Sequence, residues 1–319
     1  MSEERANPTG FRARHLAVVG LGLMGASIVL ALRSRADRIT GVDPSPQTRR
    51  YAIERGICDH VTDDLRAGVI DADVVVLAAP VRVIADIVRL RIGSYLRLNT
   101  LLIDIGSTKH EICDAMGRLP IGIHAIGGHP MTGKEVSGIE AADGDLYRHR
   151  PFVLCATRRT TPATRLRALS FVEALGAEPI EMEAERHDKI VAGISHLPYI
   201  LSASLVATIV NEARKDDAYW ELAAGGFRDM SRLAGSDIKM MGDIISTNSR
   251  AVATLLARFR VQLAIMETML ISGDIDELLE LLFPVRQARL EWMERYEQRR
   301  HNGSSNGQAH RQPGEVVKG

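Results

Sequence analysis

The sequence predicts an α/β fold in which a doubly wound sheet is followed by an all-helical C-terminal domain. The first half of the chain alternates short, continuously apolar runs with helical patterns, which is typical of a buried and mostly parallel sheet. A glycine-rich turn comes directly after the first apolar run. Beyond residue 184 the apolar spacing becomes helical and no strand pattern remains. These three observations predict the fold class and the order of its two parts.

Each apolar run of the first half is an expected strand. The runs are Leu16–Val19, Ile39–Val42, Val74–Ala78, Leu101–Ile105, Gly122–Ile126, Pro151–Ala156 and Glu178–Glu181. The helices expected between them are Pro46–Glu54, Val81–Leu96, Ser107–Met116 and Pro162–Leu175. Ser45 before Pro46 is typical of a helix start, with an N-cap serine and proline in the first helical position. The later strands can be mixed in direction.

The change of period near Ala184 predicts a domain boundary. We expect one domain over residues 13–184 and a helical domain over 185–298. Residues 299–319 are polar and rich in glycine and serine, so we expect them to form a disordered tail.

The glycine-rich turn has the pattern Gly20-x-Gly22-x-x-Gly25. Gly20 permits the tight turn, Gly22 lets the backbone approach a pyrophosphate, and Gly25 lets the following helix pack closely on the strand. Phosphates can then bind the free N–H groups at the helix N-terminus. Asp43 ends the second expected strand, where its carboxylate accepts hydrogen bonds from a ribose 2′-hydroxyl and repels a 2′-phosphate. The pattern therefore predicts a Rossmann-like dinucleotide site that takes NAD rather than NADP.

Composition argues against several other classes of protein. Lys and Arg together number 40, as do Asp and Glu, so no net field attracts nucleic acid or an acidic membrane. The three cysteines form no CxxC pair, and we expect buried, reduced thiols in a cytoplasmic protein without a metal site. The apolar run from Leu16 to Leu32 is interrupted by the fingerprint glycines and is followed by no cleavage site. We therefore expect neither a secretory signal nor a membrane span there.

Three polar loops are expected beyond the carboxyl ends of strands, where open α/β sheets bind their ligands. They are Ala78–Val81, Gly106–Lys109 and the glycine-rich segment 127–138. The last of these loops contains His129, a candidate base, because a neutral imidazole can take a hydroxyl proton as a hydride leaves the same carbon. A surface histidine is an equally good interpretation of His129 alone.

The helical half contains two polar clusters. Ser195 and His196 interrupt an apolar run beside Pro198, which removes a helical hydrogen bond and predicts a kink. A satisfied core histidine is as good an interpretation of His196 alone. Arg228 and Arg232 are four residues apart and share a helical face, so they could bind carboxylates through bidentate hydrogen bonds. The alternative is a solvated face on which acidic neighbours pair with the two arginines.

Taken together, these segments resemble the prephenate/arogenate dehydrogenase family of tyrosine biosynthesis. The residues that carry the resemblance are Gly20–Gly25 with Asp43, Asp104–Lys109, Gly127–Pro130 with Gly133, Glu135 and Ser137–Gly138, His187–Asp188, Ser195–Pro198, and Gly225–Asp229 with Arg232. They occur in order across roughly residues 15–297. The resemblance implies an oxidative decarboxylation, in which a hydride passes from the hydroxyl-bearing ring carbon to NAD and loss of the ring carboxylate leaves an aromatic product.

The resemblance also implies roles for individual residues. By position, His129 accepts a hydrogen bond from the substrate hydroxyl, Ser107 orients that hydroxyl and the histidine, and Arg232 binds a substrate carboxylate. The supporting positions implied in the same way are Ser195, His196, Glu135, His187, Arg228 and Asp229. Tyr199 stands where some members carry another histidine near the substrate and the feedback inhibitor tyrosine, which leaves tyrosine sensitivity open. The expected cofactor-binding residues are Gly20, Gly22, Leu23, Met24, Gly25, Asp43, Ala79, Pro80 and Ser107.

Several functions stay open at the level of sequence. Prephenate, giving 4-hydroxyphenylpyruvate, is the leading substrate, and arogenate, giving tyrosine directly, is the alternative. A β-hydroxyacid dehydrogenase shares the glycine-rich opening and the helical second domain, but it relies on a catalytic lysine for which Lys189 is the only candidate. A non-catalytic NAD-sensing protein would keep the fold without turnover. The apolar stripes between Leu255 and Trp292, together with the resemblance, predict a homodimer through the helical domain.

Overall fold

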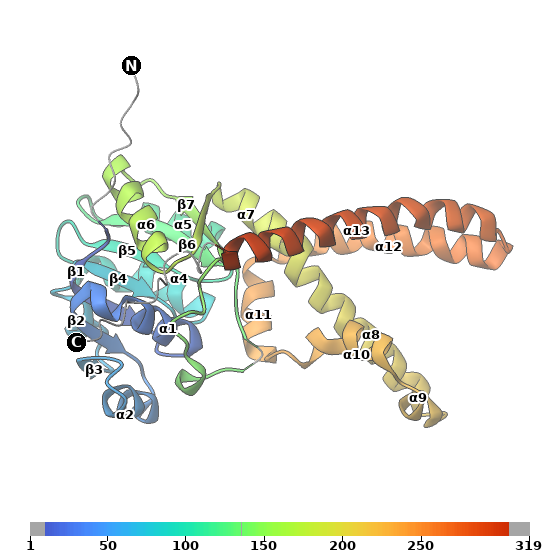
Figure 1. Cartoon of the computed structure of the whole chain (residues 1–319), viewed down its shortest axis with the longest axis horizontal. Helices are drawn as coiled ribbons and strands as arrows, with labels where there is room; N and C mark the ends of the chain where they lie inside the picture. The colour runs from blue at the N-terminus through green and yellow to red at the C-terminus, as the bar shows by residue number, and fades with distance from the viewer. Residues whose placement is uncertain (1–9, 135, 306–319) are drawn as a thin grey trace, which may run out of the picture. The chain divides into compact units, whose positions relative to one another are not determined.

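The computed structural model describes residues 10–134 and 136–305 (Figure 1). The chain divides into two compact units, the first ending at Leu255 and the second beginning at Leu256. The first unit opens with an eight-stranded sheet and continues as helices. The expected fold class, a Rossmann-like α/β sheet followed by a helical region, is confirmed.

The strands form one sheet in the order β3-β2-β1-β4-β5-β6-β7-β8. Their bounds are β1 Ala13–Val19, β2 Ala36–Val42, β3 His60–Thr62, β4 Val74–Leu77, β5 Leu101–Asp104, β6 His124–Pro130, β7 Pro151–Ala156 and β8 Glu178–Glu181. Neighbouring strands pair in parallel except β6 and β7, which are antiparallel. The strand order reverses at β1, so the carboxyl ends of β1 and β4 lie at the topological switch point where such sheets bind ligands.

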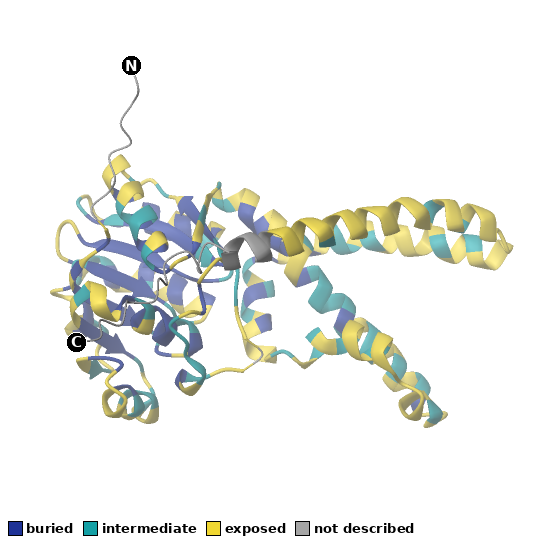
Figure 2. Ribbon diagram, in the orientation of Figure 1, coloured by how far each residue is buried: buried dark blue, intermediate teal, exposed yellow. Residues whose placement is uncertain are grey.

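Both faces of the sheet are buried, which explains why its strands are continuously apolar. Consecutive residues of β4 alternate between two cores: Val74 and Val76 belong to one, Val75 and Leu77 to the other. All four side chains have no exposed surface, and each contributes roughly 1.5–3 kcal/mol relative to an exposed position. Figure 2 shows the inner strands of the sheet as the buried centre of its fold, whereas β3 and β8 at the two edges contain no buried residue.

Helices cover both faces of the sheet. The helices of the sheet region are α1 Leu23–Leu32, α2 Pro46–Glu54, α3 Leu65–Val69, α4 Val81–Leu90, α5 His110–Gly117 and α6 Pro162–Ala174. Buried residues of α1, α2 and α6 join one core, and those of α3, α4 and α5 join the other. The start of α2 is as expected, because the Ser45 hydroxyl accepts a hydrogen bond from Thr48 N at 3.2 Å.

Three local features differ from the expectations. The short β3 and α3 were not anticipated, because three and five residues are too few to show a period. Strand β6 runs on to Pro130, so His129 lies in a strand rather than a loop; pairing with β7 satisfies the backbone of this polar segment. Helix α5 begins at His110 instead of Ser107, so Ser107 lies in the preceding turn.

The helical region of the first unit begins at Ala184. Its helices are α7 Ala184–Val191, α8 Leu197–Ala213, α9 Ala218–Glu221, α10 Gly225–Ser231 and α11 Ile238–Thr247. A π-helical turn, Ala192–His196, separates α7 from α8 and lies directly before Pro198 in the first turn of α8. Because proline has no N–H, the regular hydrogen-bond ladder cannot continue through this position. The local irregularity expected at Pro198 is thus a single π-helical turn, a feature frequent at functional sites.

The run Ala184–Ala213 is the one segment of the described chain that is long and apolar enough, by length and composition alone, to cross a membrane. Only 22% of its most apolar window is buried within this chain. A helix covered by protein meets the same criterion, so this property by itself assigns no membrane role.

Helix α12 spans Ser249–Ser272, and the part of it from Leu256 onward belongs to the second unit. The second unit also contains α13 Ile275–Ser305, and the connection between the two helices includes Gly273 at φ +75°. Exposed residues predominate on both helices (Figure 2). Large apolar side chains are among them, including those of Ile271 and Phe283. The sequence predicts a disordered tail over 299–319, but helix α13 continues into this segment as far as Ser305. The helix can continue because no glycine or proline interrupts the helical pattern between residues 285 and 302. Residues 306–319 of that segment lie outside the described residues.

Replacing Gly25 with alanine is expected to lower the free energy of unfolding by about 1–3 kcal/mol. The new Cβ would lie 1.9 Å from the carbonyl oxygen of Gly20, so helix α1 would have to shift away from β1. Gly22→Ala is the matched control, since a Cβ there would meet nothing within 4 Å. Chemical denaturation of both variants measures the difference, and equal stabilities would contradict the close packing assigned to Gly25.

Candidate active site

The glycine-rich turn lies between β1 and α1 at the switch point of the sheet. Gly20 has φ +96°, and a Cβ there would lie 2.6 Å from the carbonyl oxygen of Ala78, so the turn admits only glycine. Gly22 is open on its outer side and is the N-cap of α1, whose first turn receives no side-chain cap. The free N–H groups and the open backbone suit a pyrophosphate. These residues therefore fit a dinucleotide.

Asp43 lies at the carboxyl end of β2, beside this turn. Its Oδ2 accepts a hydrogen bond from Leu21 N and its Oδ1 from Ser45 N, each at 2.9 Å. The carboxylate is half-buried and keeps one lone pair on each oxygen for further donors. Ala79 and Pro80 follow β4 on the other side of Gly20, with Ala79 half-buried and Pro80 exposed. The geometry suits the contact with ribose hydroxyls that the sequence predicts for Asp43.

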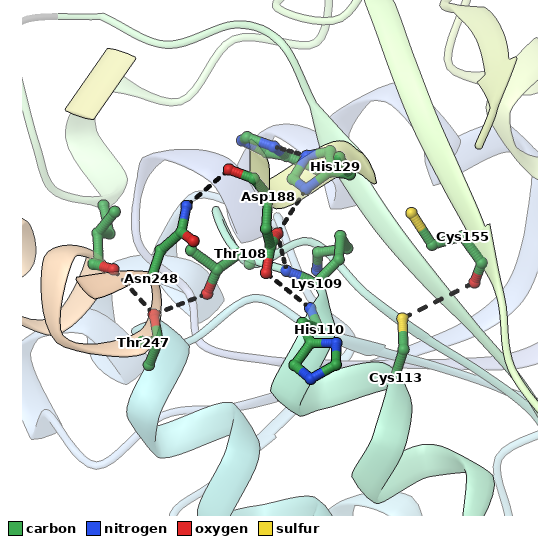
Figure 3. A network of polar contacts seen from close by, with 12 residues as sticks. Thr108, Lys109, His110, Cys113, His129, Cys155, Asp188, Thr247 and Asn248 are labelled. Atoms are coloured by element: carbon green, nitrogen blue, oxygen red, sulfur yellow. Dashed lines mark hydrogen bonds and ion pairs between the residues drawn. The ribbon is translucent and has the colours of Figure 1, made fainter. Parts of the chain in front are cut away.

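His129 belongs to a chain of three side chains that ends in a carboxylate (Figure 3). Its Nδ1 lies 2.8 Å from Nε2 of His187, and Nδ1 of His187 lies 2.8 Å from Oδ1 of Asp188. His187 and Asp188 are adjacent residues of α7 and are both buried, whereas His129 on β6 is half-buried. The structure thus joins one strand of the sheet to the first helix of the helical region through imidazole rings.

The acceptor at the end of this chain sets the direction of each hydrogen bond. A carboxylate can only accept, so Nδ1 of His187 donates to Asp188. The remaining nitrogen of a neutral His187 is then an acceptor, and Nδ1 of His129 donates to it. This leaves a lone pair on Nε2 of His129, which has no hydrogen-bond partner among the described residues. His129 is therefore held in the tautomer that a general base requires.

Asp188 also organises the turn that contains Ser107. Its Oδ1 accepts a hydrogen bond from Lys109 N at 2.7 Å and its Oδ2 one from His110 N at 2.9 Å. Burial acts to raise the pKa of Asp188, but the hydrogen bonds from His187 and from the two backbone N–H groups lower it below its ordinary value. The carboxylate is therefore ionised at neutral pH. It orients the histidine pair and ends the turn before α5.

Burial keeps His129 and His196 neutral. Burial lowers the pKa of His129 well below the ordinary 6.5, and a positive charge on His187, Lys109 or His196 acts in the same direction. Burial also lowers the pKa of His196 to about 4. The side-chain amide of Asn248, at the end of α11, donates to Nδ1 of His196 at 3.3 Å and to the carbonyl oxygen of Asp188 at 2.7 Å. His196 consequently keeps its proton on Nε2 and is a neutral hydrogen-bond donor.

The other expected residues differ in their exposure and in their partners. Ser107 is half-buried, and its hydroxyl has no partner in the described chain. Ser195 is exposed in the π-helical turn, and Tyr199 packs partly buried against the core on the α4–α5 side of the sheet. Arg228 is exposed on α10 and pairs with Asp229 at 3.0 Å. Glu135 lies outside the described residues.

Arg232 is exposed at the start of the 3-10 turn Arg232–Gly235, which follows α10. This turn is anchored to α8, because the hydroxyl of Ser202 accepts a hydrogen bond from Ala234 N at 2.9 Å. Helix α8 begins directly after His196. The turn with Arg232 is therefore tied to the same helix as the π-helical turn with Ser195 and His196.

Two contributors were not found from the sequence. Asn248 gave no signal, because a single amide between two helical patterns is unremarkable before the chain folds. Thr247 forms a hydrogen bond between its hydroxyl and that of Thr108 at 2.8 Å, which links α11 to the turn that contains Ser107. Both contacts join segments far apart in the sequence. A local pattern cannot reveal them.

The cysteines are Cys58, Cys113 and Cys155, and all three are buried free thiols. Burial raises the pKa of Cys58 to about 12, so this thiol stays protonated. Within the described residues, no group of three or more His, Cys, Asp or Glu side chains is placed to hold a metal ion.

A dinucleotide fold with a neutral, oriented histidine at the carboxyl edge of its sheet is typical of one class, the NAD(P)-dependent dehydrogenases with a helical substrate domain. Comparison with known proteins names the family within that class. Residues 28–181 match the model of the prephenate dehydrogenase nucleotide-binding domain, and residues 183–283 match that of the prephenate dehydrogenase dimerization domain. The chain belongs to the prephenate dehydrogenase family, and the resemblance seen in the sequence motifs is confirmed.

Individual relatives agree with the family match. A prephenate dehydrogenase of Lactococcus lactis is 33% identical over 282 residues, which cover 86% of this chain and 77% of the relative. The crystal structure of prephenate dehydrogenase from Aquifex aeolicus in complex with hydroxyphenyl propionate and NAD+ has a TM-score of 0.79 at 27% identity, covering 87% of this chain and 98% of that one. The crystal structure of Synechocystis arogenate dehydrogenase has a TM-score of 0.76 at 30% identity, covering 87% and 99%.

We expect kcat/KM to stay level from neutral pH down past about 6.5, the ordinary imidazole value, and to fall only at more acidic pH. The reason is that the pKa of His129 is lowered by burial, so the inactive protonated form appears only below the ordinary range. A pH–rate profile at saturating cofactor measures the acidic limb. A midpoint at or above the ordinary value would contradict the buried, neutral base.

His187→Gln and His187→Leu are the controls for this profile. Glutamine retains an acceptor for the Nδ1 proton of His129, whereas leucine does not. We expect the leucine variant to lose about 10²-fold in kcat and the glutamine variant to lose clearly less.

Proposed function

We propose that this protein catalyses the NAD-dependent oxidative decarboxylation of prephenate to 4-hydroxyphenylpyruvate and carbon dioxide in tyrosine biosynthesis. The observation that carries the proposal is the base: His129 is neutral, its Nδ1–H is fixed by His187, and its Nε2 has no partner in the described chain. This base belongs to a chain of the prephenate dehydrogenase family with an intact nucleotide-binding turn.

The bound NAD supplies the hydride acceptor. Nε2 of His129 takes the proton of the substrate hydroxyl as the hydride leaves the same ring carbon, which forms a ring carbonyl. The C–C bond to the ring carboxylate then breaks, carbon dioxide leaves, and the electron pair of that bond completes the aromatic ring. The carbonyl oxygen becomes a phenolate oxygen and takes the proton back from His129, so protons and electrons balance.

The chain from His129 through His187 to Asp188 suits this proton exchange. When His129 holds the substrate proton, its Nδ1–H still donates to His187, whose own proton faces the ionised Asp188. A carboxylate at the end of such a chain stabilises the transient imidazolium without taking the proton itself. The hydroxyl of Ser107, without a partner in the described chain, can orient the substrate hydroxyl.

Cationic and neutral donors are available for the two carboxylates of the substrate. We assign carboxylate binding to Arg232. Ser195, His196, Arg228, Tyr199 and Glu135 are assigned as supporting substrate-binding residues. Neutral His196 donates from Nε2 without adding a charge that would raise the cost of protonating His129. The dinucleotide is assigned to Gly20, Gly22, Leu23, Met24, Gly25, Ala79, Pro80 and Ser107, with Asp43 selecting NAD over NADP.

The described carboxylates favour prephenate over arogenate. Arogenate carries an ammonium group that needs an acceptor. Asp188 already accepts three hydrogen bonds, and Asp229 pairs with Arg228. The keto side chain of prephenate needs only a donor, which His196 provides. Arogenate dehydrogenase activity remains the second candidate, because a structural neighbour with that activity matches this chain over nearly its whole length.

Formation of NADH from purified protein, with prephenate, arogenate and a 3-hydroxy acid offered separately, tests the function. We expect prephenate to give the highest kcat/KM and the 3-hydroxy acid to give none. His129→Asn should lose at least about 10²-fold in kcat and retain NAD affinity, because the base is removed and the nucleotide turn is untouched. Absence of turnover with both cyclohexadienols would refute the proposal.

We also propose a cytoplasmic homodimer, with a nucleotide-binding domain over 13–184 and a substrate and dimerization domain over 185–298. The matched family model for residues 183–283 is described as a dimerization domain. Exposed apolar side chains on α12 and α13, and the low burial of the apolar run that contains α8, supply surface that a second copy of the chain would cover.

Phe283→Glu is expected to shift the dimer toward monomer, because a charge would replace an apolar side chain that is 70% exposed in the single chain. Ile121→Glu is the matched control: Ile121 is 83% exposed but lies outside the helical region. Light scattering across a dilution series gives the molar masses. A wild-type monomer at working concentration would overturn the dimer.

A further inference from the structure

A fully buried ion pair lies behind the candidate base. Asp104 is the last residue of β5, and Lys109 ends the turn that follows; neither side chain has any exposed surface. Nζ of Lys109 donates to Oδ2 of Asp104. Lysine is almost never fully buried unless it is paired, and removing two charges from water carries a large desolvation penalty. The reaction proposed above uses neither side chain, so the pair requires an explanation of its own.

Asp104 holds two segments of the site at once. Its Oδ2 also accepts a hydrogen bond from Gly106 N at 2.8 Å, and its Oδ1 accepts one from Gly128 N at 3.2 Å. The first contact fixes the residue before Ser107, and the second fixes the residue before His129. One carboxylate therefore sets the separation of the two side chains that would meet the substrate hydroxyl.

Glycines make room for this pair. A Cβ on Gly106 would lie 3.1 Å from Oδ2 of Asp104, and one on Gly127 would lie 3.3 Å from Cδ of Lys109. A Cβ on Gly128 would lie 2.5 Å from the backbone oxygen of Asp104. Gly106, Gly127 and Gly128 were expected to be loop residues, and in the structure their lack of a side chain leaves the space that the ion pair occupies.

The charge of Lys109 also acts on His129. The charged and titratable groups around His129 are His187 and Asp188 on α7, His196 in the π-helical turn, and Lys109 and Asp104 at the end of β5. Burial raises the pKa of Asp104, while Lys109 and the two glycine N–H groups oppose that rise. The side chain of Asp104 accepts hydrogen bonds from Lys109, Gly106 and Gly128 and donates none, as expected of an ionised carboxylate. The positive charge of Lys109 disfavours a proton on His129.

We infer that the Asp104–Lys109 ion pair is a positioning device for hydride transfer, which holds Ser107 and His129 in register at the carboxyl edge of the sheet. The inference rests on the function proposed above and assigns to the pair a role beyond core stability. A buried ion pair is weak support for stability, since apolar replacements are often as stable. Misplacement of a reacting group by about 1 Å, in contrast, costs about 10²-fold in rate.

The variant that tests this is D104N/K109M, which removes both charges and keeps similar shapes. We expect it to fold, to bind NAD within about twofold of wild type, and to lose at least about tenfold in kcat with a smaller change in KM. Lys109→Met alone leaves the Asp104 carboxylate buried without its cation, so we expect a lower Tm for that single variant. The matched control is R165M/E181Q, which removes an exposed ion pair between α6 and β8 and should leave kcat unchanged.

A second readout does not depend on turnover. Titration of His129, followed by NMR of histidine-labelled protein and assigned by comparison with His129→Asn, should move to higher pH in D104N/K109M, because Lys109 and not Asp104 is the member of the pair whose charge lowers the pKa of His129. If the double variant keeps both the wild-type kcat and the wild-type titration, the pair is structural only and the inference is overturned. If wild-type protein fails to turn over prephenate, the proposed function fails, while the His129 titration still decides the inference.

Discussion

The carboxylate of Asp188 is the group on which the geometry of the site depends. It accepts hydrogen bonds from His187 and from the backbone of Lys109 and His110. The first contact sets the tautomer of two imidazole rings, and the other two end the turn after β5 and start α5. Because a carboxylate only accepts, one buried negative charge orients His129 through His187 and anchors the turn that contains Ser107 at the same time.

The sheet supplies the second constraint. Parallel strands deliver their carboxyl ends to one edge, so β1, β4, β5 and β6 bring the glycine turn, the Ser107 turn and His129 to the same side. Strand β6 then departs from the simple pattern. It continues as far as Pro130 because the antiparallel β7 pairs with it, and this makes His129 part of a strand. Rigid placement suits a group that must meet a reacting atom closely.

Neutrality of the imidazoles follows from burial more than from any single charge. Burial is the largest cause that lowers the pKa of both His129 and His196. Asn248 and His187 then decide which nitrogen of each ring holds the proton. The result is that Nε2 of His129 has a lone pair that can accept a hydrogen bond, whereas Nε2 of His196 has a proton that it can donate. Two histidines thereby take opposite hydrogen-bonding roles without either being charged.

The sequence by itself determined the fold class, the nucleotide turn and the residues at the ends of successive strands, because these depend on local periodicity and on glycines at set spacing. Only the tertiary structure decided which of them meet. The contacts of His129 with His187, of Asp104 with Gly128 and of Asn248 with His196 join residues separated by 58, 24 and 52 positions. Short elements such as β3 and the extension of β6 form because they pair with neighbouring strands, and the local sequence pattern therefore does not predict them. Hydrogen bonds between distant segments form only when the core places both groups together, and this is why the tautomer of His129 and the buried Asp104–Lys109 ion pair could be seen only in the folded chain.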